Sequence, residues 1–107
     1  MRYVMSYTAP TMTFDIFDYL HQSEDRLGAE QPEGFGMTAV ALLMRSNAFQ
    51  QHDAVELKRL ARGLRQINLD TMRLARAYPD VFHPDIMRSR EAENRIYDAV
   101  LKDAQTI

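Results

Sequence analysis

The longest regular pattern of hydrophobic and polar positions in the chain runs from Asp53 to Tyr78. Counted in heptads from Leu57, its a and d positions are Leu57, Leu60, Leu64, Ile67, Thr71, Leu74 and Tyr78. Six of these seven are apolar or aromatic, and a spacing of three and four residues is typical of one face of an α-helix. Asp53 with Glu56 resembles a capping box, and Pro79 follows as a stop. The pattern therefore predicts one long amphipathic helix over 53–78.

The apolar seam of this helix has two interpretations that periodicity does not distinguish. It is either the side that faces the core of the chain or a coiled-coil-like contact with a second copy, which would make the protein a homodimer. Asn68 and Asp70 lower the helix propensity at mid-length. A kink near Asn68 is therefore the alternative to one straight rod.

Three shorter stretches complete an all-α prediction. Thr13 is a suitable N-cap for a helix over 13–27, which Gly28 would end. Thr38 starts a second helix over 38–50, apolar on most sides, and Pro84 starts the last helix over 84–104. Residues 1–12 favour an extended arm. The expected architecture is a single domain, 1–107, built as a bundle of about four helices with an extended N-terminal arm.

Several apolar side chains outside the long helix are expected to face the core. In the first helix and in the loops they are Phe14, Phe17, Leu20, Leu27, Phe35, Val81 and Phe82. The second helix is so apolar that it must be central in the fold or pressed against another chain.

Composition narrows the classes of function. The chain has no cysteine, which excludes disulfides and thiolate chemistry. No run approaches the roughly 18 apolar residues of a membrane span, and the N-terminus lacks the apolar core of a secretory signal. These features predict a cytoplasmic protein without a membrane span. The net charge of −2 argues against a generic nucleic-acid binder.

The charges are distributed unevenly along the chain. Residues 1–56 carry three Lys or Arg against eight Asp or Glu, whereas residues 57–107 carry ten against seven. The long helix carries a second face opposite its apolar seam, here called the arginine face. Its members are Arg59, Arg62, Arg65, Leu69, Arg73 and Arg76. Either the acidic and basic halves face each other within the fold, or this face is a binding surface for a partner.

The sequence offers little catalytic or metal chemistry. Asp18 with His21, and Asp80 with His83, have the i,i+3 spacing of metal-binding helical bundles. However, the second pair lies between two prolines, and no inward-facing Glu pair accompanies either one. No serine lies in a nucleophile-elbow motif. We expect no enzyme, no catalytic residue, no metal site and no cofactor.

The expected function is therefore that of a small protein-binding regulator, adaptor or inhibitor that acts through a helical surface. Small helical proteins of this kind occur among phage- or mobile-element-type modulators of a host. The partner-binding residues are expected to be those of the arginine face. The alternative is a nucleic-acid-associated regulator that uses the same arginines to contact phosphates.

Overall fold

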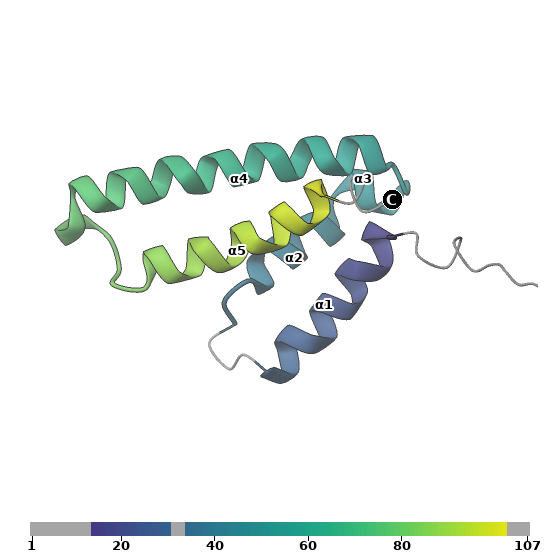
Figure 1. The fold of residues 1–107 in the computed structure, drawn as a ribbon, viewed down its shortest axis with the longest axis horizontal. Coiled ribbons are helices and arrows are strands. Elements are labelled where there is room, and N and C mark those ends of the chain that lie inside the picture. The colour runs from purple at the N-terminus through teal and green to yellow at the C-terminus, as the bar shows by residue number, and fades with distance from the viewer. Residues whose placement is uncertain (1–13, 31–33, 103–107) are drawn as a thin grey trace, which may run out of the picture.

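The described part of the chain is mainly helical, as predicted. The computed structural model describes residues 14–30 and 34–102, and this part of the chain contains no strand. Its elements are α1 (Ile16–Glu30), α2 (Met37–Arg45), α3 (Asn47–Gln50), α4 (Ala54–Ala77), the 3-10 helix η3 (Pro79–Val81) and α5 (Ile86–Leu101) (Figure 1). The all-α prediction with four main helices is confirmed. The predicted arm, residues 1–12, lies outside the described residues.

Helix α1 is shifted from its predicted position. Asp15 caps it, because its Oδ1 accepts hydrogen bonds from the N–H groups of Phe17 (2.9 Å) and Asp18 (3.4 Å). The predicted cap, Thr13, lies outside the described residues. At the other end the helix continues through Gly28, so the predicted stop there is wrong. A glycine inside a helix costs only about 1 kcal/mol, which does not force an end.

The predicted helix over 38–50 is in fact two helices. Ser46 has an extended backbone (φ −69°, ψ 154°) that separates α2 from α3. Its hydroxyl donates to the carbonyl of Leu43 (2.6 Å) and accepts from the N–H of Phe49 (3.1 Å). One serine side chain thus satisfies the end of α2 and the start of α3.

Helix α2 is central, as its composition indicated. It contacts α1, α3, α4 and α5, and its Ala39, Val40 and Leu43 are fully buried. Leu20 and Leu27 of α1 join this core, with Phe14 and Phe17 partly buried at its edge. None of the helices in the described part of the chain is long and apolar enough to span a membrane.

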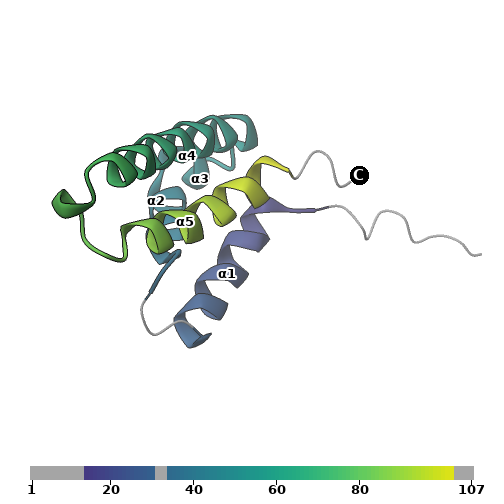
Figure 2. The ribbon, with the colours of Figure 1, turned by 60° about the vertical axis from the view of Figure 1, so that its left-hand side comes forward.

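Helix α4 is one continuous rod of 24 residues, without a break at Asn68. Its start is capped by Asp53, whose Oδ1 accepts from the N–H of Glu56 (3.1 Å). It packs along α5, and the two helices run side by side in both views (Figures 1 and 2). The end of α4 that leads to η3 extends beyond α1 and α2 (Figure 1). Within the described residues, α5 and the short η3 segment are the main elements that pack against that end.

The buried stripe of α4 does not follow the predicted heptad seam. Its buried residues are Leu57, Ala61, Asn68, Met72 and Ala75. This is the 3.6-residue period of a straight helix, which rotates by about 20° per heptad away from a 3.5-residue repeat. Leu57 is therefore buried, whereas Ile67, Leu74 and Tyr78 are exposed. The interpretation of the whole seam as core is wrong in the second half of the helix.

The segment between α4 and α5 also departs from the prediction. Val81 is 75% exposed rather than directed inward, because η3 lies at the unsupported end of α4. Phe82 is half-buried. Helix α5 begins at Ile86, since Pro84 belongs to a turn closed by the Ile86 N–H and the His83 carbonyl (3.0 Å).

Candidate protein-binding surface

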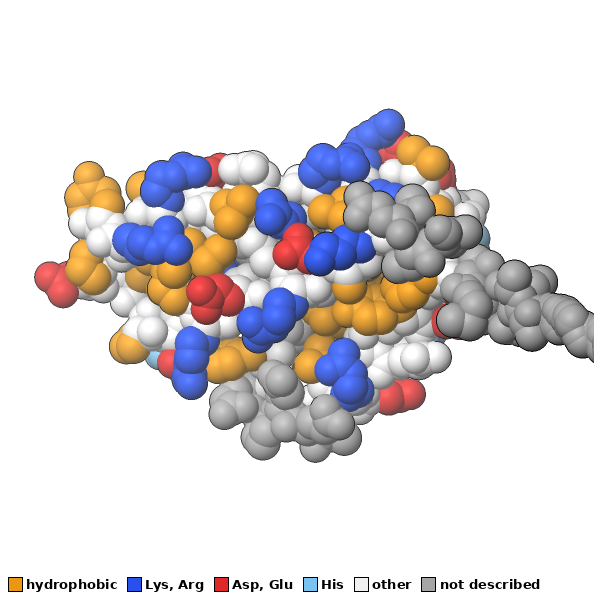
Figure 3. Space-filling view, in the orientation of Figure 1, with side chains coloured by type: hydrophobic (Ala, Val, Ile, Leu, Met, Phe, Trp, Pro, Cys, Tyr) orange, Lys and Arg blue, Asp and Glu red, His pale blue; other side chains and the backbone are white. Residues whose placement is uncertain are grey.

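The arginine face extends along α4 and is exposed at Arg59, Arg62, Arg73 and Arg76, with Arg65 and Leu69 half-buried. Between Ala54 and Ala77 the helix carries six Lys or Arg against two Asp or Glu. Lys and Arg side chains are spread over α4 and α5 on the face shown in Figure 3, interspersed with hydrophobic ones and few acidic ones. At 100° per residue, the mean direction of the arginine face lies about 170° from that of the heptad seam. The core stripe, which is the row of buried α4 residues described above, lies between these two directions.

Arg62 and Arg76 are the least constrained members of the arginine face. Both are exposed, and neither forms an ion pair within the described part of the chain. They are 14 residues apart, or about 21 Å along the helix at 1.5 Å per residue. A partner that reaches both guanidinium groups must present acceptors over a similar span.

Arg59 and Arg73 are held by carboxylates of their own helix. Arg59 pairs with Glu56, and Arg73 Nη2 lies 3.1 Å from Asp70 Oδ1. All four side chains remain largely exposed, and surface pairs of this kind contribute only about 0–1 kcal/mol. Both arginines can therefore exchange these partners for a carboxylate on another molecule at little cost.

Arg65 has a different role from the other arginines. Its Nε lies 2.6 Å from Asp98 Oδ1, so it ties α4 to α5, and both side chains are partly exposed. The acids that hold the α4 arginines within the described residues are thus Glu56, Asp70 and Asp98. None of them belongs to α1. Among the side chains that the structure describes, no acid of α1 pairs with an arginine of α4.

Two apolar side chains lie among the arginines. Leu69 is half-buried between Arg65 and Arg73 in helical projection, and Val55 is 69% exposed near the start of the helix. Apolar contacts next to guanidinium groups are typical of protein–protein interfaces. The arginine face therefore combines charge with small hydrophobic contact points.

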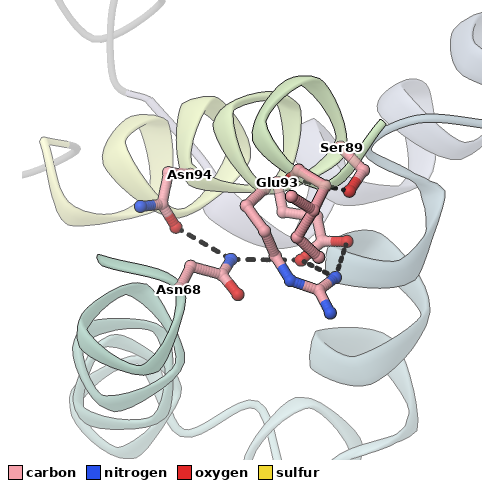
Figure 4. Close-up of polar contacts among 6 residues, drawn as sticks. Asn68, Ser89, Glu93 and Asn94 are labelled. Carbon is pink, nitrogen blue, oxygen red and sulfur yellow. Dashed lines mark hydrogen bonds and ion pairs between the residues drawn. The ribbon is translucent and has the colours of Figure 1, made fainter. Parts of the chain in front are cut away.

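A buried polar network fixes the rotation of α4 about its axis, and so the directions of the arginine face and of the heptad seam. Asn68 Nδ2 donates to Glu93 Oε1 (3.1 Å) and to Asn94 Oδ1 (3.0 Å) on α5 (Figure 4). Asn94 Nδ2 in turn donates to the carbonyl of Arg65 (3.4 Å). Glu93 is also paired with Arg90 (3.1 Å). Because any rotation of α4 would break these bonds, the network sets which residues face outward.

Sequence reasoning missed this network, although Asn68 carried a signal. An asparagine lowers helix propensity, and here it was interpreted as a place for a kink. Projected at 3.6 residues per turn from Leu57, however, Asn68 falls on the buried stripe with Ala61 and Met72. A buried asparagine requires hydrogen-bond partners, which α5 supplies.

The two acid–histidine pairs lie apart from each other. The ring of His21 packs against Phe49 with centroids 5.5 Å apart, and His83 Nδ1 accepts from the N–H of Asp85 (3.0 Å). No three His, Asp or Glu side chains within 14–30 and 34–102 come together as metal ligands would.

Comparison with known proteins adds no family or relative to this description. No family model matches the chain, and no similar characterised protein or solved structure was found. The fold and surface define a small all-α domain with an exposed basic helix.

Proposed function

We propose that the chain is a small protein-binding regulator, and that the arginine face of α4 binds an acidic surface of its partner. The observation that carries this proposal is the pair Arg62 and Arg76, two exposed arginines without an acid partner among the described residues. Arginine is well suited to this role because its planar guanidinium group forms bidentate bonds with carboxylates and is weakly hydrated. Leu69 supplies an apolar contact between them.

The rigidity of α4 supports the same proposal. The helix is continuous, and the Asn68 network and the Arg65–Asp98 pair fasten it to α5. A rigid helix presents its arginines at fixed spacing, so little conformational entropy is lost at the backbone on binding. This matches a surface that recognises a folded partner with a complementary row of carboxylates.

A second candidate function is binding to a nucleic acid through the same face. The excess of six basic over two acidic residues on α4 favours it. Against it, three of the five arginines already have carboxylate partners, and the acids would repel phosphates. We therefore place the protein partner first, and salt dependence distinguishes the two. Nucleic-acid affinity falls with salt at a log–log slope of several units when several phosphates are contacted.

The experiment is affinity capture from the native cell with charge-reversed variants. The double variant Arg62→Glu/Arg76→Glu should lose its captured protein, whereas Arg26→Glu/Arg45→Glu should retain it. The second variant makes the same change in net charge at exposed arginines of α1 and α2. Circular dichroism should show equal helix content in both. Equal capture by the two variants would remove the arginine face from the account, and capture of nucleic acid alone would favour the second candidate.

A further inference from the structure

The second exposed side of α4 is the heptad seam, here Leu60, Leu64, Ile67, Thr71, Leu74 and Tyr78. Leu60, Leu64 and Thr71 are half-buried, whereas Ile67 (59%), Leu74 (51%) and Tyr78 (60%) are exposed. From Leu60 to Tyr78 the seam extends for about 27 Å at 1.5 Å per residue. A solvent-exposed apolar row at coiled-coil spacing is a surface that another helix can cover.

The charges in the strip of α4 between the seam and the arginine face follow a self-complementary order. Glu56, Arg59, Asp70 and Arg73 alternate negative, positive, negative, positive along the helix, and all four are exposed or half-exposed. Glu56 and Arg73 have their midpoint between residues 64 and 65. Arg59 and Asp70 have the same midpoint. Reversing the helix about this point therefore places each charge opposite one of the other sign.

We propose that the seam binds a second copy of this chain, with the two α4 helices antiparallel about an axis between Leu64 and Arg65. In this register the Glu56–Arg59 pair of one copy lies beside the Asp70–Arg73 pair of the other, twice over. A parallel two-fold pairing would place this strip on opposite sides of the two helices, so that the Glu56–Arg59 and Asp70–Arg73 pairs of the two copies would not meet. The charge pattern thus selects the antiparallel arrangement, as flanking charges do in coiled coils.

The same register gives Tyr78 a place to insert. It directly follows the last residue of α4, so in this register it comes beside the start of α4 in the second copy, where a hollow of about 310 Å³ lies between α3 and α4. Ala48, Gln51 and Leu60 are among its lining residues. Leu60 belongs to the seam, so the hollow lies on the side of α4 that the second copy covers. An exposed tyrosine and a hollow at matching positions form a contact at each end of the interface.

Gly63 lies near the centre of this interface. It is exposed in the middle of α4, and a Cβ added there would meet nothing within 4 Å. A glycine at an exposed mid-helix position costs about 1 kcal/mol relative to alanine, and packing within the single chain does not explain it. Between two antiparallel helices, the missing side chain lets the backbones approach closely.

The centre of this interface lies on the opposite side of α4 from Arg62 and Arg76, the two arginines that carry the proposed function. Arg59 and Arg73 lie at the edge that the two surfaces share. The seam is one narrow apolar row, so it buries less surface area than a standard protein–protein interface. We therefore expect a reversible dimer with a Kd of about 1–100 µM. The first test is sedimentation velocity from about 1 to 500 µM. The chain as it stands should pass from monomer to dimer over this range.

Matched variants show whether the seam is responsible. Ile67→Asp places a carboxylate on the seam at a position already exposed in the single chain, so folding should be unaffected, and the Kd should rise at least tenfold. Leu42→Asp makes the same kind of change at an exposed apolar position of α2 and should leave the Kd unchanged. A strict monomer at about 500 µM, or equal loss of the dimer in both variants, would overturn the proposal.

Charge reversal tests the pairing partners. Glu56→Arg and Arg73→Glu should each raise the Kd, because each places like charges opposite one another in two places. The double variant Glu56→Arg/Arg73→Glu should restore the affinity, because the two exchanged charges again face opposite charges across the interface. Failure of the double variant to recover would overturn the register.

Spin labels test the direction of the helices, and the absence of cysteine makes single labelling simple. In the proposed register, the two labels at Gln66→Cys, one on each copy, lie about 5 Å apart along the helix axis. The two labels at Ala77→Cys lie about 38 Å apart along it. Electron resonance should therefore give a short distance at 66 and a long one at 77. Short distances at both positions would mean a parallel pair and would overturn the proposal.

Discussion

Asn68, at the middle of α4, donates its side-chain amide to Glu93 Oε1 on α5 across 3.1 Å. Both side chains are buried, and the bond joins the two helices that pack most extensively against each other. The contact holds α4 at one rotation about its axis. That rotation leaves the arginine face on one side of the core stripe and the seam on the other.

Removal of this hydrogen bond should destabilise the fold. Asn68→Ala removes the donor to Asn94 Oδ1 and one of the donors to Glu93, which keeps Arg90, and it opens a small cavity. The free energy of unfolding should therefore fall by about 2–3 kcal/mol. Gln66→Ala, which removes only an exposed bond to Asp70 (3.1 Å), should change it by less than about 0.5 kcal/mol. Urea denaturation followed by circular dichroism measures both. Similar values for the two variants would show that the network does not hold α4.

Ser23 is a second buried polar residue, and its environment is the opposite of that of Asn68. It is 1% exposed on α1, and its hydroxyl has no hydrogen-bond partner among the described residues. A buried, unpaired hydroxyl costs about 1–3 kcal/mol of desolvation. Ser23→Ala should therefore raise the thermal midpoint by several degrees, since alanine also has the higher helix propensity. A lower midpoint would mean that the hydroxyl has a partner in solution.

Tyr97 should make the fold sensitive to alkaline pH. Burial raises the pKa of its phenol from 10.0 to about 12, the charge of Glu93 adds to this, and Arg90 opposes it. A folded pKa above the unfolded one gives stability that is present below pH 10 and lost as the pH rises toward 12. The free energy of unfolding should fall between these values, and that of Tyr97→Phe should fall less steeply. Parallel curves for the two proteins would contradict the shift.

Two glycines should respond in opposite ways to alanine. Gly63 has a helical backbone with open space around it, so Gly63→Ala should stabilise the monomer by about 0.5–1 kcal/mol. Gly36, at the start of α2, has a φ of 94°, and an added Cβ would lie 3.4 Å from Leu27 Cδ1. Gly36→Ala should cost at least about 1 kcal/mol. Denaturation below about 1 µM, a concentration at which the proposed dimer would dissociate, measures both. A loss of stability at Gly63 would contradict this account of α4.

Much of the fold follows from local sequence signals. The caps and stops of α4, Asp53 and Pro79, act over one helical turn and are visible in the sequence. The break at Ser46 was missed because serine is tolerated within helices. Its role depends on both neighbouring helix ends being arranged around one hydroxyl.

The buried side of α4 was harder to predict because it depends on a small difference in period. Over three heptads the 3.5- and 3.6-residue repeats diverge by about 60°. That angle moves Leu74 out of the core and brings Ala75 into it. The sequence contains both patterns, and only the position of α5 decides which one is buried. The arginine face was identified from the sequence alone, whereas the pairing of Arg65 with Asp98 depends on the packing of α4 against α5.

The central claim is that the arginine face of α4 meets another protein, and site-specific photo-cross-linking in the native cell tests it most directly. A photoreactive residue in place of Val55 lies on the arginine side of α4 and removes no charge, and one in place of Gln22 on α1 is the control. We expect a discrete adduct to another protein from position 55 only, which disappears in Arg62→Glu/Arg76→Glu. Equal adducts from both positions, or an adduct from position 55 that survives the charge reversal, would contradict the account.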